Sequence, residues 1–177
     1  MRLLFVCTGN ICRSPAAAIV ARSVLRADRF FSVTSAGTAA VAGSGVHPST
    51  AEALQRRGLD PSGHVAQELT KSLIDEADVV LTMSLRQRSL VVTMSPQALR
   101  RTFTLREFAR VAAATEGEEH DPAELVWTAV KLRGMLRGED DVTDPMRSSS
   151  PGHDATVSVI SELVGVVQHR FVVAMHG

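Results

Sequence analysis

Residues 6–15 read Val-Cys-Thr-Gly-Asn-Ile-Cys-Arg-Ser-Pro and directly follow a short apolar run, Leu3–Val6. The run predicts a buried β-strand, and Ser14 with Pro15 predicts the first turn of a helix. The glycine and asparagine between them tolerate the backbone angles of a tight turn. The stretch therefore predicts a strand, a compact loop, and a helix whose N-terminus points into the loop.

Such a loop is suited to a tetrahedral anion, because its backbone N–H groups and the helix N-terminus converge on one point. Cys7 would lie at the centre, and Arg13 follows it by six positions. The N–H dipoles and the Arg13 cation would favour the thiolate form of Cys7, which is a nucleophile. No Gly-Lys-Ser/Thr and no Gly-x-Gly-x-x-Gly is present here, which excludes the two common nucleotide-binding loops.

Residues 7–15 resemble the signature of the low-molecular-weight protein tyrosine phosphatases. The resemblance continues in the family's order at Thr34–Thr38, Arg57–Asp60, His64, Leu69-Thr70, Ala77–Met83 and Asp144-Pro145. Residues 111–141 are the segment that is hard to place, and we expect a surface elaboration there rather than an altered rim of the site. The resemblance implies a four-stranded parallel sheet in the order 2-1-3-4, with the phosphate-binding loop after the first strand.

The rest of the chain predicts the same α/β class. Leu3–Val6, Phe31–Thr34, Val79–Thr82 and Thr102–Thr104 are the expected strands, and they alternate with helical segments. This alternation is typical of a parallel sheet with helices on both faces. With 177 residues and no linker or repeat, we expect one domain over residues 1–177.

Composition restricts the class of partner. The formal net charge is zero, which argues against a nucleic-acid surface or an anionic membrane anchor. The apolar start is too short for a signal peptide, and no apolar stretch is long enough to span a bilayer. Both cysteines lie in the loop, as expected in a reducing compartment. We therefore expect a cytoplasmic monomer or weak homodimer that needs no cofactor, and the ligand spacing predicts no metal site.

The resemblance implies a covalent phosphatase acting on phosphotyrosine in proteins. Cys7 would attack phosphorus, Arg13 would bind two phosphoryl oxygens, and Asp144 would protonate the leaving oxygen. Water activated by Asp144 would then hydrolyse the phosphocysteine. Asp141 and Asp154 are the nearby competitors for the acid role.

Supporting roles are expected for the rest of the loop and for two residues outside it. Backbone amides of the phosphate-binding loop would bind the anion, and Ser14 would donate a hydrogen bond to the thiolate; the loop residues are Thr8, Gly9, Asn10, Ile11, Cys12 and Ser14. In the family pattern, Asn10 with Ser35 and His64 forms a network that holds the loop. Cys12 would form a reversible disulfide with Cys7, or it is simply a small buried hydrophobe. His153 is expected to be a solvated surface group.

The substrate wall departs from the family pattern. Aromatic residues usually follow the Asp-Pro, but here Met146 does, and Val41 stands near the position of a common tryptophan. The chain has no tyrosine. The same chemistry on a small phosphomonoester is therefore an alternative. A thiol-dependent arsenate reductase is less favoured, since Cys12 alone is available to resolve the adduct. A binding module without turnover is opposed by the presence of Cys7, Arg13 and Asp144.

Overall fold

The structure is a computed structural model, and it describes residues 1–25, 30–115 and 122–176. Its helices and strands follow in this order: β1 Arg2–Cys7, α1 Arg13–Leu25, β2 Ser32–Gly37, α2 Pro48–Gln55, α3 Lys71–Glu76, β3 Val79–Thr82, α4 Leu85–Met94, η1 Pro96–Arg101, β4 Thr102–Thr104, α5 Leu105–Ala114, α6 Pro122–Leu132, η2 Pro145–Arg147 and α7 Ser150–His176. The labels η1 and η2 denote 3₁₀ helices. Within these residues, no helix combines the length and apolar character that crossing a bilayer requires.

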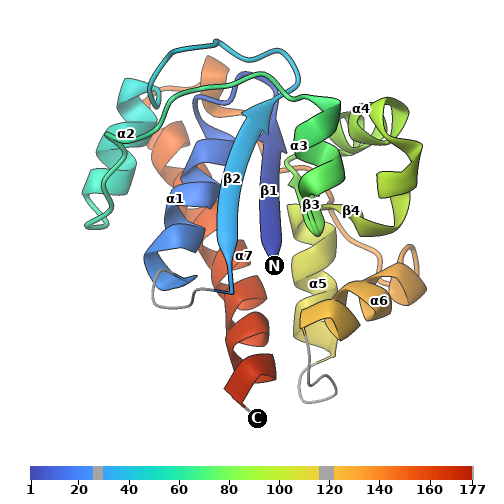
Figure 1. Cartoon of the computed structure of the whole chain (residues 1–177). Helices are drawn as coiled ribbons and strands as arrows, with labels where there is room; N and C mark the ends of the chain where they lie inside the picture. Colours follow the sequence, from blue (N-terminus) through green and yellow to red (C-terminus); the bar gives the residue numbers. More distant parts are fainter. Residues whose placement is uncertain (26–29, 116–121, 177) are drawn as a thin grey trace.

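The four strands form one parallel sheet in the order β2-β1-β3-β4, which confirms the predicted topology (Figure 1). β1 lies in the interior of the sheet, and Leu3 through Cys7 are all buried. In the register, Cys7 pairs with Gly37 and Val6 pairs with Thr82. The carboxyl end of β1 is therefore bordered on both sides by strands that end at the same edge.

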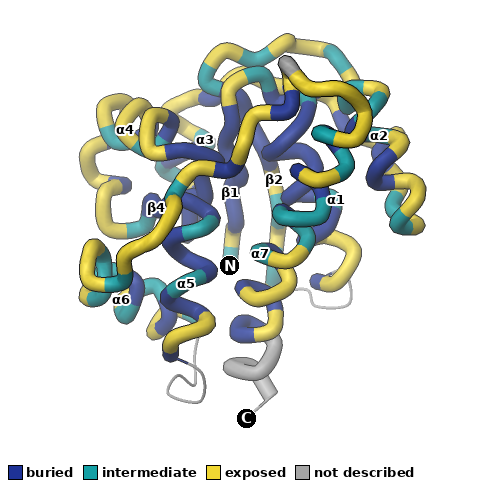
Figure 2. The backbone as a smooth tube through the Cα atoms, turned by 180° about the vertical axis from the view of Figure 1, so that it is seen from behind, coloured by how far each residue is buried: buried dark blue, intermediate teal, exposed yellow. Residues whose placement is uncertain are grey.

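Two apolar cores cover the two faces of the sheet. On one face, Leu3 and Phe5 belong to a large core that includes buried residues of α1, α5, α6 and α7. On the other face, Leu4 and Val6 pack in a smaller core that reaches α3 and α4. Figure 2 shows β1 as mostly buried and the first half of β2 as more exposed, and the segments at the strands' carboxyl edge as mostly intermediate or exposed. This exposed edge carries the loop after β1.

Several helix starts are fixed by local hydrogen bonds. Thr104 accepts a bond from the backbone of Glu107, whose carboxylate accepts one in return from the Thr104 N–H, so α5 begins with a capping box. Ser84 caps α4 in a similar way, through the N–H of Gln87. Both caps directly follow strands, so these helices begin at the carboxyl edge of the sheet.

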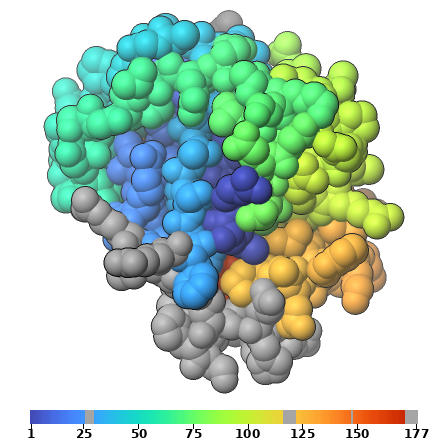
Figure 3. All heavy atoms as spheres, in the orientation of Figure 1, coloured from blue at the N-terminus to red at the C-terminus, as the bar shows by residue number. Residues whose placement is uncertain are grey.

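Within the segment 111–141, helix α6 packs away from the loop, whereas Asp141 returns to the start of α4 at the carboxyl edge. Helix α6 packs against α5 and η1, and Figure 1 shows it at the end of the sheet opposite the carboxyl edge. Figure 3 shows the chain after β2 and before α3 covering the upper edge of this face, while α6 lies at the lower right. This arrangement agrees with a surface elaboration. Residues 116–121 lie outside the described residues.

Candidate functional site

The loop after β1 folds around the sulfur of Cys7. The backbone N–H of Asn10 donates to Cys7 Sγ at 3.3 Å, and Ser14 Oγ donates at 3.0 Å. α1 begins at Arg13, one residue before Ser14, so Ser14 lies in the first helical turn rather than at the N-cap. Its hydroxyl is therefore directed back to the sulfur. Both donors stabilise a negative charge on Cys7, and the side chain is buried.

Asn10 holds the loop in its curved shape. It is the one non-glycine residue with positive φ, 53°, among the described residues. Its amide nitrogen donates to Ser14 Oγ at 2.9 Å and to Ser35 Oγ at 3.0 Å, and its amide oxygen accepts from the N–H of Gln67 at 3.0 Å. Left-handed backbone is costly for most residues but tolerated by asparagine. The network predicted between Asn10 and Ser35 is thus present.

His64 supports the same residue from the backbone side. Its Nε2 lies 2.7 Å from the carbonyl oxygen of Asn10, so this nitrogen carries the proton and donates. Burial lowers the pKa of His64, and the nearby Arg22 lowers it further, while the bond to Asn10 raises it. The imidazole is therefore held in its neutral form and acts as a fixed donor to the loop.

Close packing explains why β2 ends in a glycine. A Cβ atom on Gly37 would lie 2.4 Å from the carbonyl oxygen of Thr8, so no larger residue fits there. The backbone of Thr8 and Gly9 is held by hydrogen bonds from Ala39 and Val41. The chain after β2 thus borders the phosphate-binding loop directly.

Two glutamines that the sequence analysis missed also support the loop. Gln87 is buried at the start of α4; its amide nitrogen donates to Thr8 Oγ1 at 3.1 Å and its amide oxygen accepts from Met83 N at 3.0 Å. Gln67 donates from its side chain to the carbonyl of Ser35 at 3.0 Å. No spacing in the sequence pointed to either residue, because both reach the loop from distant segments.

Arg13 and Asp144 lie together at the mouth of the loop. Arg13 Nη2 donates to Asp144 Oδ2 at 2.7 Å, and Nη1 donates to the carbonyl of Val142 at 3.1 Å. The Arg13 side chain is 8% exposed and that of Asp144 is 49% exposed. The buried guanidinium is thus fixed in orientation, while the carboxylate can reach a ligand from solvent.

The two competitors for the acid role lie elsewhere. Asp141 accepts a hydrogen bond from the backbone of Leu85, at the start of α4. Asp154 pairs with Arg57 and Arg56, which lower its pKa to about 2. Asp144 is therefore the only one of the three that is paired with Arg13.

The rim of the loop is apolar and lacks aromatic rings. Ile11 is half-buried, and both Val41 and Met146 are about half exposed, at 49% each. Ile11 and Val41 both lie near the α-carbon of Gly9, because a Cβ built there would approach 3.4 Å and 3.7 Å from their side chains. The backbone N–H of Met146 donates to Asp144 Oδ1 at 3.2 Å, so one of the two predicted wall residues stands beside the predicted acid.

Cys12 points away from solvent, into a second cluster. Its Sγ lies 3.5 Å from Met146 Sδ, and it is hydrogen-bonded to the Thr50 side chain. Burial raises the pKa of the Cys12 thiol to about 11. Both cysteines are free thiols, so a Cys7–Cys12 disulfide stays a prediction.

His153 is not on the surface, and the prediction for it was wrong. It is buried at the start of α7, where its Nδ1 lies 2.8 Å from Thr50 Oγ1 and its ring stacks on His47. The reason is tertiary packing, since α7 packs against α2. Cys12, His47 and His153 thereby gather into one group of potential metal ligands, with one ligand atom of each within 4.8 Å of the others.

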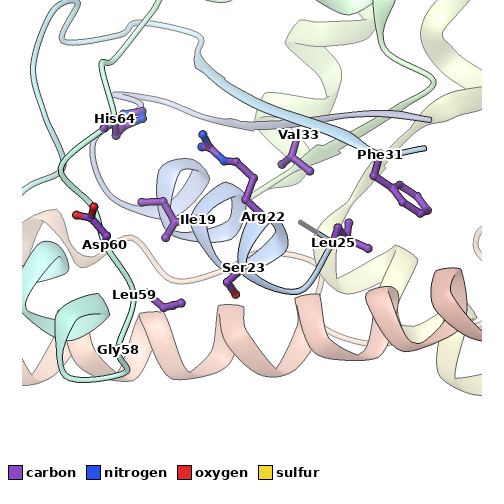
Figure 4. Close-up of a pocket in the computed structure, with 11 residues that line it drawn as sticks. Ile19, Arg22, Ser23, Leu25, Phe31, Val33, Gly58, Leu59, Asp60 and His64 are labelled. Carbon is purple, nitrogen blue, oxygen red and sulfur yellow. The ribbon is translucent and has the colours of Figure 1, made fainter. Parts of the chain in front are cut away.

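A separate cavity of about 640 Å³ lies behind the loop. It is lined by α1, β2 and the segment after α2, and Figure 4 shows Arg22 and Asp60 among its lining residues. His64 lines it as well, but Cys7, Arg13 and Asp144 do not. The cavity touches the loop only through a supporting residue.

Comparison with known proteins agrees with this geometry. Residues 2–129 match the family model described as low molecular weight phosphotyrosine protein phosphatase. The probable low molecular weight protein-tyrosine-phosphatase EpsP of Ralstonia nicotianae is 40% identical over 140 residues, which cover 78% of this chain and 90% of the relative. A protein-arginine-phosphatase of Geobacillus stearothermophilus is 38% identical over 122 residues, which cover 68% of this chain and 78% of the relative.

A solved structure extends the likeness to the fold. It is the arginine phosphatase YwlE, described as a cysteine-to-serine mutant with a phosphorylated active-site serine. It matches with a TM-score of 0.74 at 26% identity, covering 96% of this chain and 95% of that one. The family model ends before Asp144, so the match to that model does not include this residue.

Proposed function

The chain belongs to the low-molecular-weight phosphotyrosine protein phosphatase family, and we propose on that basis that it hydrolyses phosphotyrosine in proteins through a phosphocysteine on Cys7. One observation carries the proposal. Cys7 Sγ accepts hydrogen bonds from the Asn10 N–H and Ser14 Oγ in the loop that Arg13 closes, with Asp144 paired to Arg13. This arrangement supplies a nucleophile, an anion site and a proton donor together.

In the first step, the Cys7 thiolate attacks phosphorus and a sulfur–phosphorus bond forms. The bond from phosphorus to the tyrosine oxygen breaks, and protonated Asp144 gives its proton to that oxygen. The Arg13 guanidinium and the loop amides bind the remaining phosphoryl oxygens, where charge is spread in the transition state. The step uses no metal ion.

In the second step, water attacks the phosphocysteine and Asp144, now a carboxylate, accepts the water's proton. The sulfur–phosphorus bond breaks and inorganic phosphate leaves. Ser14 and the Asn10 N–H, at 3.0 Å and 3.3 Å from Cys7 Sγ, stabilise the thiolate as it departs. The same two donors therefore serve both steps, because the sulfur is anionic at the start and at the end.

The contact between Arg13 and Asp144 is one that a substrate can replace. A phosphoryl dianion that binds Arg13 competes with Asp144 for the guanidinium, so the Asp144 carboxyl group is released toward the leaving oxygen. The Asp144 side chain is 49% exposed, which leaves room for that movement.

The rim supports an aryl substrate. Ile11, Val41 and Met146 offer apolar surface, and Met146 contributes a polarisable thioether that packs against a ring. A phosphoarginine side chain presents N–H donors instead, for which these three side chains offer no strong acceptor. Phosphoarginine is nevertheless the second candidate, because the Geobacillus stearothermophilus relative is a protein-arginine-phosphatase. A small phosphomonoester is the third, since the rim lacks aromatic walls.

A substrate panel tests the proposal. The purified protein is assayed with phosphotyrosine, phosphoarginine and phosphoserine peptides and with a sugar phosphate, in excess chelator. We expect the highest kcat/KM with phosphotyrosine and unchanged rates in chelator. A higher kcat/KM with phosphoarginine, or with the sugar phosphate, would make that compound the preferred substrate and would contradict the assignment of phosphotyrosine. Loss of turnover in chelator would overturn the metal-free scheme.

Cys7→Ser is the matched control for the covalent step. We expect it to abolish hydrolysis while the protein still binds phosphate, because the loop amides and Arg13 remain. Activity equal to that of the unaltered protein would exclude the phosphocysteine. A folded protein that turns over none of the four substrates would contradict the enzymatic proposal as a whole.

A further inference from the structure

Three potential metal ligands converge beside the phosphate-binding loop. Cys12 lies in the loop, His47 directly precedes α2, and His153 lies in the first turn of α7. One sulfur or ring-nitrogen atom from each lies within 4.8 Å of the other two. Cys12 and His153 are buried, with exposed fractions of 4% and 2%. Segments far apart in the sequence therefore bring a thiol and two imidazoles together.

We propose that Cys12, His47 and His153 form a binding site for a divalent cation of borderline softness, of which Zn²⁺ is the natural example. One thiolate and two imidazoles are a ligand set that zinc takes in proteins, with Zn–S near 2.3 Å and Zn–N near 2.0–2.1 Å. Tetrahedral bonds of those lengths separate the ligand atoms by about 3.3–3.6 Å. The three atoms therefore need to approach one another by at most about 1.5 Å, which side-chain rotation supplies.

The two histidine rings lie against each other in the cluster. The two rings are stacked with centroids 4.6 Å apart, a contact that two imidazolium cations would not favour. His47 Nδ1 is buried and has no hydrogen-bond partner among the described residues. An unpaired buried nitrogen is costly, and a metal ion would satisfy it.

The residues around the cluster suit the same ion. Thr50 Oγ1 lies 2.8 Å from His153 Nδ1 and is also hydrogen-bonded to Cys12, so it orients two of the three ligands. Met146 Sδ lies 3.5 Å from Cys12 Sγ, which leaves the fourth position to this thioether or to water. No carboxylate belongs to the group. Hard cations such as Mg²⁺, which prefer oxygen ligands, are therefore disfavoured.

Zinc binds cysteine as a thiolate, so binding at Cys12 displaces the thiol proton. As the Zn–S bond forms, the S–H bond breaks and the proton passes to the buffer. The site thus predicts that zinc binding releases protons.

Titration calorimetry tests the site without relying on phosphatase activity. The full chain carrying Cys7→Ser is used, so that the other thiol cannot bind the ion. We expect one Zn²⁺ per chain, proton release when buffers of different ionisation enthalpy are compared, and no heat of binding with Mg²⁺. Co²⁺ should give a thiolate-to-cobalt charge-transfer band, which Cys12→Ser should remove.

Histidine variants identify the ligands. His47→Asn and His153→Asn should each weaken Zn²⁺ binding by about 100-fold or more, because even indirect partners of a metal contribute 10–100-fold. His169→Asn is the matched control, since His169 is an exposed histidine on the same helix as His153. Circular dichroism checks that each variant is folded. If His153→Asn does not fold, His47→Asn still tests the site, because His47 is only half-buried. The proposal is overturned if the Cys7→Ser protein binds no Zn²⁺. It is also overturned if His47→Asn binds Zn²⁺ as tightly as the control His169→Asn does.

Discussion

Replacing Asn10 by alanine tests directly what holds the phosphate-binding loop. The Asn10 side chain is fully buried and makes three hydrogen bonds, to Ser14, Ser35 and the backbone of Gln67. Each contributes about 1 kcal/mol net, and alanine at φ 53° costs about 1–2 kcal/mol of steric strain. We expect the free energy of unfolding to fall by about 4 kcal/mol, which lowers Tm by about 8–16 °C in a chain of this length.

Urea unfolding measures the loss, and Asn10→Gly is the matched control. Glycine removes the same three hydrogen bonds but adopts the left-handed backbone without steric cost. After allowance for the greater flexibility of glycine in the unfolded chain, we expect Asn10→Gly to be more stable than Asn10→Ala by roughly 0.5–1 kcal/mol. A loss below about 1 kcal/mol in Asn10→Ala, or an alanine variant more stable than the glycine variant, would refute the reasoning.

Three further outcomes are expected. Mild peroxide should join Cys7 to Cys12 in a linkage that dithiothreitol reverses, and peptide mapping that finds sulfinic Cys7 without the linkage would contradict this. The fold lowers the pKa of both His64 and His153 from 6.5. As the pH falls, the unfolded chain therefore binds more protons than the folded protein does. The free energy of unfolding, measured in urea, should therefore fall from about pH 7.5 to about pH 5.5, and less steeply in His153→Gln; equal slopes would exclude that contribution. Val41→Trp should raise kcat/KM for a phosphotyrosine peptide by about 2–10-fold through ring stacking, and an equal gain with a sugar phosphate would point to another cause.

The loop and the fold class are predictable because their signals are local. An apolar strand, a turn with Gly9 and Asn10, and Arg13 at a fixed spacing from Cys7 lie within a dozen residues. The sheet order is different, because strand pairing is a long-range property; it followed from the family resemblance, which is confirmed. The helix starts at Arg13, two residues before Pro15, and Ser14 lies inside its first turn and donates to the sulfur of Cys7.

The parts that sequence reasoning missed are contacts between distant segments. Gln67 and Gln87 act through amide groups that could equally face solvent, and Val142 acts through its carbonyl oxygen, which any residue provides. His153 has polar neighbours along the chain and was expected at the surface, but packing of α7 against α2 buries it. The cluster with Cys12 follows from the same packing. Ligand spacing along the sequence carries no trace of it, because its members are 35 and 106 positions apart.

Burial divides the site into a part that tolerates little change and a part that tolerates much. The groups around Cys7 are buried polar side chains, such as Asn10, Ser14 and Ser35, each with its partners in place. Removing any one leaves a buried donor or acceptor unpaired, which costs stability as well as geometry. Val41 and Met146 are half exposed, so their replacement costs little. The rim can therefore change at little cost in stability, whereas the loop cannot.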